Sequence, residues 1–125
     1  MSPQDDHHDG VLIVDDDSGF RAVVEELLQA FGYEVVCAEN GAVALDLLRR
    51  GLRPSIILLD LMMPEINGWE FLALKRREPA LADIPVAILS GVDSLEAKAA
   101  TVDACALLKK PIDLDTLLAV VAKTR

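Results

Sequence analysis

Five short apolar segments recur along the chain. Each has the length of a strand that is buried on both faces of a parallel sheet. Continuous runs of this kind, rather than alternating apolar and polar residues, mark strands covered by helices on either side. The expected strands are Val11–Val14, Glu34–Cys37, Ser55–Leu59, Ile84–Leu89 and Ala106–Leu108.

Between these segments the apolar residues recur at intervals of three and four, as on one face of a helix. Gly32 and Gly51 are expected to end the first two helices, and Asp113 to cap the last one. Asp17 is placed to start the first helix. The expected helices are Ser18–Phe31, Ala42–Arg50, a third through Trp69, Phe71, Leu72 and Leu74, a short fourth near Ser94–Val102, and a fifth through Leu114, Leu117, Leu118 and Val121.

The alternation predicts one α/β domain, in which a doubly wound parallel sheet of five strands carries five helices on its two faces. With strand order 2-1-3-4-5, the first and third strands are neighbours at the point where the order reverses. We expect residues 10–125 to form this domain and residues 1–9 to be a flexible tail. The length of 125 residues suits a single domain.

The charge and the cysteines narrow the class of protein. The chain has 21 acidic and 12 basic residues and a net charge of −9, which argues against a nucleic-acid-binding surface. Its apolar runs are too short to cross a bilayer, and no signal peptide is evident, so we expect a cytoplasmic protein. Cys37 and Cys105 lack a CxxC arrangement and are expected to be buried thiols.

Chemically active residues stand where four of the five strands end. Asp15 and Asp16 follow the first strand, Asp60 the third, Ser90 the fourth and Lys110 the fifth. Because the carboxyl ends of parallel strands share one edge of the sheet, these residues should converge there. Three carboxylates in one pocket repel each other, and oxygen ligands favour a hard cation such as Mg²⁺. With a hydroxyl and an ammonium nearby, the pocket suits a tetrahedral anion, and Asp60 is the expected nucleophile.

Four motifs in this order resemble the receiver domains of response regulators, which have a flavodoxin-like fold. They are Val14-Asp15-Asp16, Leu59-Asp60-Leu61-Met62-Met63-Pro64 with Gly68, Leu89-Ser90-Gly91 and Lys110-Pro111. Residues 10–124, nearly the whole chain, share the resemblance.

The resemblance implies a role for each residue of the site. Asp60 would be the phospho-acceptor. Asp16, Asp60 and the backbone carbonyl of Met62 would bind Mg²⁺ directly, and Asp15 would hold it through water. Ser90 and Lys110 would contact the phosphoryl group. The Lys110–Pro111 bond would be cis, an isomer that X-Pro bonds adopt at low cost, and Lys109 would be a solvated neighbour.

The family also implies partners and a mode of action. A histidine kinase or a histidine phosphotransfer protein would supply the phosphoryl group to Asp60, and phosphorylation would switch binding to a downstream partner. The chain would catalyse only its own phosphorylation and dephosphorylation. We expect a monomer or a weak dimer that binds neither nucleic acid nor membrane.

Departures from the family pattern concern the output of the signal. Leu107 stands where the family has Tyr or Phe, and Asp103-Ala104 replaces a Gly-Ala pair. The segment between Ser90 and Lys110 is about two residues short, which favours a short or irregular fourth helix.

Two further positions concern the lifetime of the phosphoryl group. Apolar groups at the positions of Met62 and Val92 would hinder the attacking water and predict a long-lived phosphoryl group, although loop packing explains them equally well.

Two alternatives remain open at the level of sequence. A pseudo-receiver would keep the fold as an interaction module without phosphorylation, and Leu107 is compatible with it. A phosphatase of the haloacid dehalogenase class also uses an aspartate at a strand end. It needs a second acid two residues later, however, and this chain has Met62 there.

Overall fold

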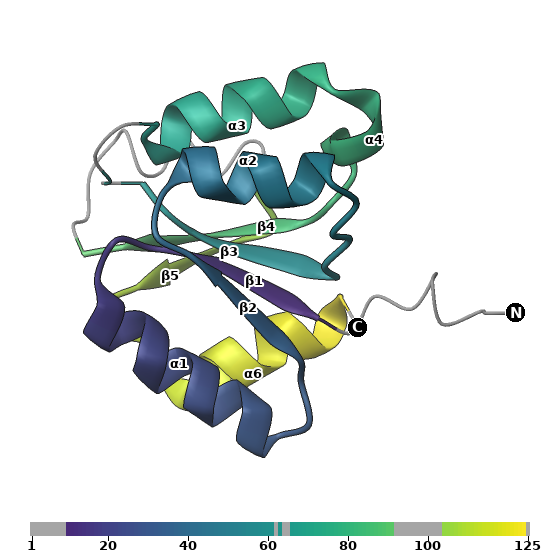
Figure 1. Cartoon of the computed structure of the whole chain (residues 1–125). Helices are drawn as coiled ribbons and strands as arrows, with labels where there is room; N and C mark the ends of the chain where they lie inside the picture. The colour runs from purple at the N-terminus through teal and green to yellow at the C-terminus, as the bar shows by residue number, and fades with distance from the viewer. Residues whose placement is uncertain (1–9, 62, 64–65, 92–103, 125) are drawn as a thin grey trace, which may run out of the picture.

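The computed structural model describes residues 10–61, 63, 66–91 and 104–124. A parallel sheet of five strands lies between two layers of helices (Figure 1). Helices α2, α3 and α4 lie on one face of the sheet, and α1 and α6 lie on the other. The strands are β1 (Val11–Val14), β2 (Val35–Ala38), β3 (Ile56–Asp60), β4 (Val86–Ser90) and β5 (Ala106–Lys109). The helices are α1 (Ser18–Ala30), α2 (Gly41–Arg49), α3 (Gly68–Arg77), α4 (Pro79–Ala82) and α6 (Leu114–Lys123).

The strand order is β2-β1-β3-β4-β5, which confirms the predicted doubly wound topology. In the register of β1 and β3, Val14 lies opposite Leu59. In that of β3 and β4, Asp60 lies opposite Leu89. All the strands therefore end at the same edge of the sheet, where the acidic residues were expected.

Alternate residues of each strand point to opposite faces, and this divides the core in two. Leu12 of β1 and Ile57 of β3 belong to the cluster under α2 and α3. Ile13 of β1 and Leu58 of β3 belong to the cluster with α1 and α6. All four side chains are fully buried. Both faces of the sheet are thus covered, which explains why the strands are apolar throughout rather than alternating.

Helix boundaries follow the local signals in the sequence. The side chains of Asp17 and Asp113 accept hydrogen bonds from backbone N–H groups in the first turns of α1 and α6, as predicted. Asn67 and Glu70 form a reciprocal capping box at the start of α3. Gly32 and Gly51 follow α1 and α2 with φ values of +90° and +115°, a backbone conformation that glycine adopts without strain.

Several element boundaries differ from the prediction. The fourth strand begins at Val86 rather than Ile84, because the N–H of Ile84 donates to Leu81 at the end of the single-turn helix α4. Pro85, which comes between them, has no N–H to donate. The sequence pattern did not predict α4. The helix expected near Ser94–Val102 and the tail at residues 1–9 lie outside the described residues.

The expectation of two buried thiols is wrong, because neither cysteine is fully buried. Cys37 is half-buried in β2, whereas Cys105 is exposed, and neither forms a disulfide. Cys105 immediately precedes β5, which is an edge strand. An edge position leaves one side of a strand without a neighbouring strand, so an apolar sequence context does not ensure burial there.

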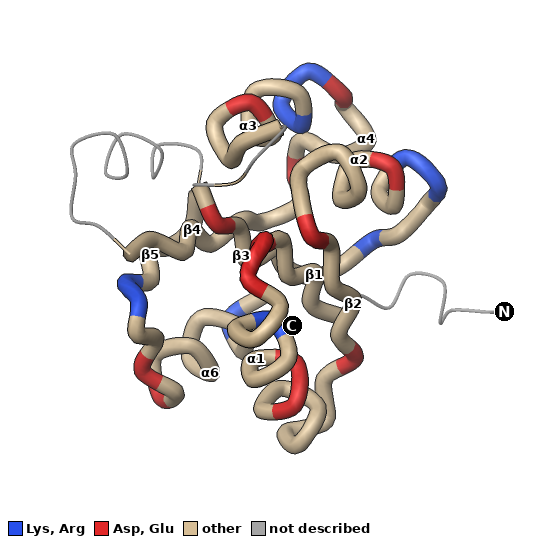
Figure 2. Tube along the Cα trace, turned by 60° about the vertical axis from the view of Figure 1, so that its left-hand side comes forward, with Lys and Arg blue, Asp and Glu red and all other residues tan. Residues whose placement is uncertain are grey.

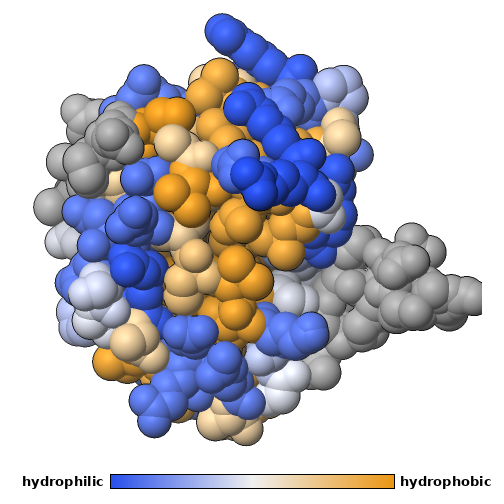
Figure 3. Space-filling model, viewed as in Figure 1, coloured by the Kyte–Doolittle hydropathy of each residue, from blue (hydrophilic) through white to orange (hydrophobic). Residues whose placement is uncertain are grey.

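An apolar band crosses the face of the molecule that carries α2 and β2 (Figure 3). Val43 of α2 and Val36 of β2 are both 36% exposed. Because β2 forms the edge of the sheet, the apolar interior reaches the surface at this place.

Candidate functional site

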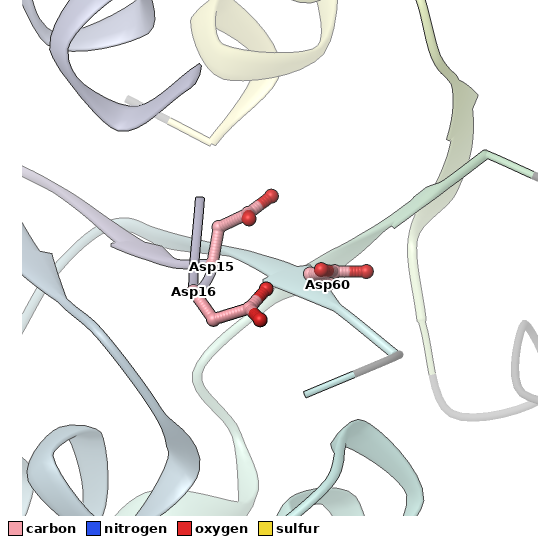
Figure 4. A group of neighbouring side chains, drawn as sticks. All are labelled: Asp15, Asp16 and Asp60. Carbon is pink, nitrogen blue, oxygen red and sulfur yellow. The ribbon is translucent and has the colours of Figure 1, made fainter. Parts of the chain in front are cut away.

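Acidic positions of the backbone lie where β1 and β3 end (Figure 2), and three of them form a carboxylate cluster. Each of Asp15, Asp16 and Asp60 contributes one carboxylate oxygen to a group of three oxygen atoms that lie within 4.8 Å of one another. Their side chains project into a common region beyond the sheet edge (Figure 4). The neighbouring positions of β1 and β3 bring them together, as the strand order predicted. Oxygen donors at this spacing suit a hard divalent cation.

The three carboxylates differ in their exposure to solvent. Asp15 is fully buried and Asp60 is 6% exposed, whereas Asp16 is exposed. A buried negative charge needs compensation from hydrogen bonds or from positive charge, because water no longer solvates it. Asp15 and Asp60 therefore depend on their protein surroundings more strongly than Asp16 does.

Lys110 supplies positive charge to the two buried carboxylates. Its Nζ lies 2.7 Å from Oδ2 of Asp15 and 3.8 Å from Oδ2 of Asp60. The same Nζ lies 4.4 Å from the centre of the Phe20 ring. The Lys110 ammonium thus stands between two carboxylates from different strands and an aromatic ring from α1.

Hydrogen bonds fix the segment that carries Asp15. Its Oδ1 accepts a hydrogen bond of 2.9 Å from the N–H of Asp17, and its backbone carbonyl accepts one of 2.6 Å from Nη1 of Arg21. With Lys110 on Oδ2, both carboxylate oxygens of Asp15 have donors. The bend between β1 and α1 is therefore held at three points, which orients the buried carboxylate.

Ser90 ends β4 and is 4% exposed. Its backbone carbonyl accepts a hydrogen bond of 2.7 Å from the N–H of Lys110. This bond ties the strand end that carries the hydroxyl to the residue that carries the ammonium. Lys109 is exposed, as expected for a solvated neighbour of Lys110, and the Lys110–Pro111 peptide bond is cis.

The family model described as "Response regulator receiver domain" matches residues 11–122. The chain belongs to this family. Response regulator MprA of Mycobacterium sp. strain KMS is 37% identical over 111 residues, which are 87% of this chain and 47% of MprA. The regulator RpaA of Synechocystis, a DNA-binding transcriptional regulator, is 35% identical over 87% of this chain and 46% of its own length. The chain spans about half the length of these relatives.

Solved structures agree with this assignment. Chemotaxis protein CheY4 of Vibrio cholerae superposes with a TM-score of 0.84 at 33% identity, over 93% of this chain and 98% of CheY4. A putative response regulator from Chloroflexus aurantiacus also gives 0.84, at 30% identity over 92% of this chain and 95% of its own. Receiver domains accept phosphoryl groups as signals and are not enzymes in the ordinary sense, and they bind Mg²⁺ at an acidic pocket.

The receiver motif glycine allows a close approach beside the site. A Cβ atom on Gly68 would lie 2.6 Å from Cα of Leu61 and 2.9 Å from the backbone oxygen of Asp60. These are backbone atoms of the segment that carries the central aspartate, so they have little freedom to move. Gly68 also donates its N–H to the Leu61 carbonyl at 3.0 Å. The start of α3 therefore packs directly on the end of β3.

Some residues with a predicted role in the receiver domain lie outside the part of the chain that the structure describes. Met62, whose carbonyl was expected to bind the metal, lies outside the described residues, as do Val92 and Asp103. Leu107 is half-buried and packs against the apolar cluster under α2 and α3. Among the described residues, no helix is long and apolar enough to cross a membrane.

The sequence reasoning missed two residues of the site, Phe20 and Arg21. Both lie in the first turns of α1, where the spacing of apolar residues at three and four marks Phe20 only as part of the apolar face of the helix. The spacing places Phe20 on the inner side of α1, but no local pattern indicates that its ring meets a lysine 90 positions further along the chain. Packing of α1 against the sheet brings the two together.

Proposed function

We propose that Asp60 accepts a phosphoryl group from a phosphohistidine in a Mg²⁺-dependent reaction. The observation that carries this proposal is the position of Asp60 beside two further carboxylates and 3.8 Å from the Lys110 ammonium. Such a site combines a nucleophile with groups that balance the charge of an incoming phosphoryl group. Lys110 and Ser90 are proposed to contact its oxygens.

In the proposed reaction, an oxygen of the Asp60 carboxylate attacks the phosphorus in line. A P–O bond to Asp60 forms as the P–N bond to the donor histidine breaks, and the electron pair of that bond returns to the imidazole ring. Lys110 stabilises charge on the transferred group, and its partly buried position strengthens this attraction. The product is an aspartyl phosphate and a free histidine side chain.

The residues fit the divalent cation that the family uses. Asp16 and Asp60 would bind Mg²⁺ directly together with the Met62 carbonyl, and Asp15 would act through water. Contact between Asp15 and the metal through water agrees with the hydrogen bonds of Asp15, because both of its carboxylate oxygens already accept one from a protein group. When bound, Mg²⁺ lowers the repulsion between the carboxylates and the phosphoryl oxygens.

The donor is proposed to be a histidine kinase or a histidine phosphotransfer protein, since the relatives are response regulators. Phosphorylation would shift a conformational equilibrium and change the affinity for a downstream partner. A monomer or weak dimer in the cytoplasm, with residues 10–125 as the receiver domain, completes the proposal. The net charge of −9 supports a protein rather than a nucleic acid as the partner of this region.

Incubation with acetyl phosphate and Mg²⁺ tests the proposal. Intact-mass measurement should show one added phosphoryl group, which chelation of Mg²⁺ and the Asp60→Asn substitution should each abolish. Asp46→Asn, on the exposed side of α2, is the matched control and should be labelled like the wild type. A chain that takes up no label would instead act as a pseudo-receiver, and sustained turnover of phosphate esters would indicate a phosphatase.

A further inference from the structure

Among the described side chains, three groups lie close to the ammonium of Lys110. Two are the carboxylates of Asp15 and Asp60, at 2.7 Å and 3.8 Å from Nζ. The third is the ring of Phe20, whose centre lies 4.4 Å from Nζ. A cation at this distance from the face of an aromatic ring is attracted by the negative charge density of that face.

Phe20 is fixed well enough to act on a single side chain. It is the third residue of α1, and its N–H donates to Oδ1 of Asp17, the residue that caps the helix. Its side chain is half-buried and packs against the apolar cluster between the sheet and α1. The helix start and the apolar packing therefore both restrain the ring, whereas Lys110 has a longer side chain with more rotatable bonds to order.

The three contacts differ in what they would do when a phosphoryl group arrives. Lys110 has to exchange part of its contact with Asp15 for phosphoryl oxygens. The ring contact can persist, because an uncharged ring neither repels the phosphoryl group nor competes with it. A carboxylate at the same position would also hold the ammonium, but it would add a fourth negative charge to the site.

We propose that Phe20 is a positioning residue that holds the Lys110 ammonium beside Asp60 and thereby promotes phosphoryl transfer. This inference rests on the proposed function of Asp60. The face of the ring, rather than its bulk, carries the effect. Phe20 favours the ordered position of a long side chain that would otherwise sample several rotamers in solvent.

Two substitutions separate the ring from its bulk. Phe20→Leu keeps an apolar side chain that fills most of the space, and Phe20→Tyr keeps the ring. Phe31→Leu is the matched control, since Phe31 follows the last residue of the same helix and is 53% exposed. With acetyl phosphate and saturating Mg²⁺, Phe20→Leu should be phosphorylated about threefold to tenfold more slowly than wild type, a loss typical of a cation–π contact. Phe20→Tyr and Phe31→Leu should stay within about twofold.

A readout without phosphorylation examines the contact itself. In the Mg²⁺-free protein, the side-chain methylene signals of Lys110 should be displaced by the ring current of Phe20 in NMR spectra. Phe20→Leu should remove this displacement, and Phe20→Tyr should keep it. In titrations with Mg²⁺ alone, Phe20→Leu should bind the metal at least as tightly as wild type, because a less ordered ammonium repels the cation less.

A double-mutant cycle gives the sharpest test. In a Lys110→Ala background, the Phe20→Leu substitution should cause no further loss in phosphorylation rate. A loss of equal size in both backgrounds, or a matching loss of Mg²⁺ affinity, would show that Phe20 only packs and would overturn the inference. The inference would also be overturned if the NMR signals of the Lys110 methylene groups stayed unchanged in Phe20→Leu, whatever the phosphorylation result. A wild-type chain that takes up no phosphoryl group would remove the proposed function, a distinct outcome from either of these.

Discussion

Lys110 and Asp15 lie 95 residues apart in the chain, and Nζ of the lysine is 2.7 Å from Oδ2 of the aspartate. Asp15 is fully buried, and the side chain of Lys110 is 24% exposed. The Lys110 ammonium thus brings a positive charge directly onto a buried carboxylate of the acidic pocket. The ends of β1 and β5 therefore depend on each other electrostatically, although they are not neighbours in the sheet.

Lys110→Met should destabilise the metal-free protein, because it leaves the buried carboxylate of Asp15 without its ammonium partner. Removing one partner of a fully buried pair costs 3–5 kcal/mol, and partial exposure of Lys110 reduces the expected loss to about 1–3 kcal/mol. Urea denaturation with a chelator present measures it. Lys109→Met, at the exposed neighbour, should change stability by less than about 1 kcal/mol. An unchanged midpoint for Lys110→Met would contradict the role of the pair.

Asp16→Asn should remove most of the stabilisation that Mg²⁺ binding gives to the folded protein. In the wild type, Mg²⁺ at 100 times its dissociation constant should raise the free energy of unfolding by about 2.7 kcal/mol. The variant should lose most of this gain. Without metal it should be at least as stable as the wild type, since one of three repelling charges is gone. Thermal unfolding with and without Mg²⁺ measures both effects, and Glu26→Gln on the exposed face of α1 should respond to Mg²⁺ like the wild type.

Gly68→Ala should destabilise the fold by about 1–3 kcal/mol, the range for overpacked sites. The new Cβ atom would meet backbone atoms of Leu61 and Asp60 at 2.6 Å and 2.9 Å. Gly19→Ala is the control, because its Cβ atom would come no closer than 3.4 Å to another atom and alanine favours the helix. Equal stability of the two variants in denaturant titrations would refute the close approach.

The ion pair of Glu78 with Arg49 should make the free energy of unfolding depend on pH in the acid range. The hydrogen bond and the charge of Arg49 hold the pKa of Glu78 below its ordinary value of 4.5. The stabilisation by this pair is therefore complete above 4.5 and is lost as the pH falls through the lower pKa of the folded state. The difference in unfolding midpoint between wild type and Glu78→Gln should shrink as the pH falls below 4.5. A difference that stays constant would count against the pair.

Met62→Asn combined with Val92→Glu should shorten the lifetime of the phosphoryl group, because polar side chains at these positions would admit and orient the attacking water. Both positions lie outside the described residues, so this prediction depends on the family pattern alone. Loss of the phosphoryl group after removal of the donor measures the lifetime. A variant that dephosphorylates no faster than the wild type would favour loop packing as the role of both residues.

Local patterns predicted most of the architecture. Each strand was located within about two residues, and Asp17 and Asp113 cap their helices as expected. These successes share a cause, since strand burial, helix periodicity and capping depend on residues within one or two turns of each other. The boundary of β4 was wrong where the competing helix α4, only one turn long, left no periodic signal.

The residue types at the ends of four strands also predicted which residues make up the site. Parallel strands bring their carboxyl ends to one edge, so the sequence by itself determined that Asp15, Asp16, Asp60, Ser90 and Lys110 would stand at that edge. Only the tertiary structure decided which of them touch. Lys110 pairs with Asp15, the Phe20 ring faces the same ammonium, and Gly68 packs on Leu61. Such contacts depend on how helices settle on a twisted sheet, and residues far apart in the chain carry no local signal of them.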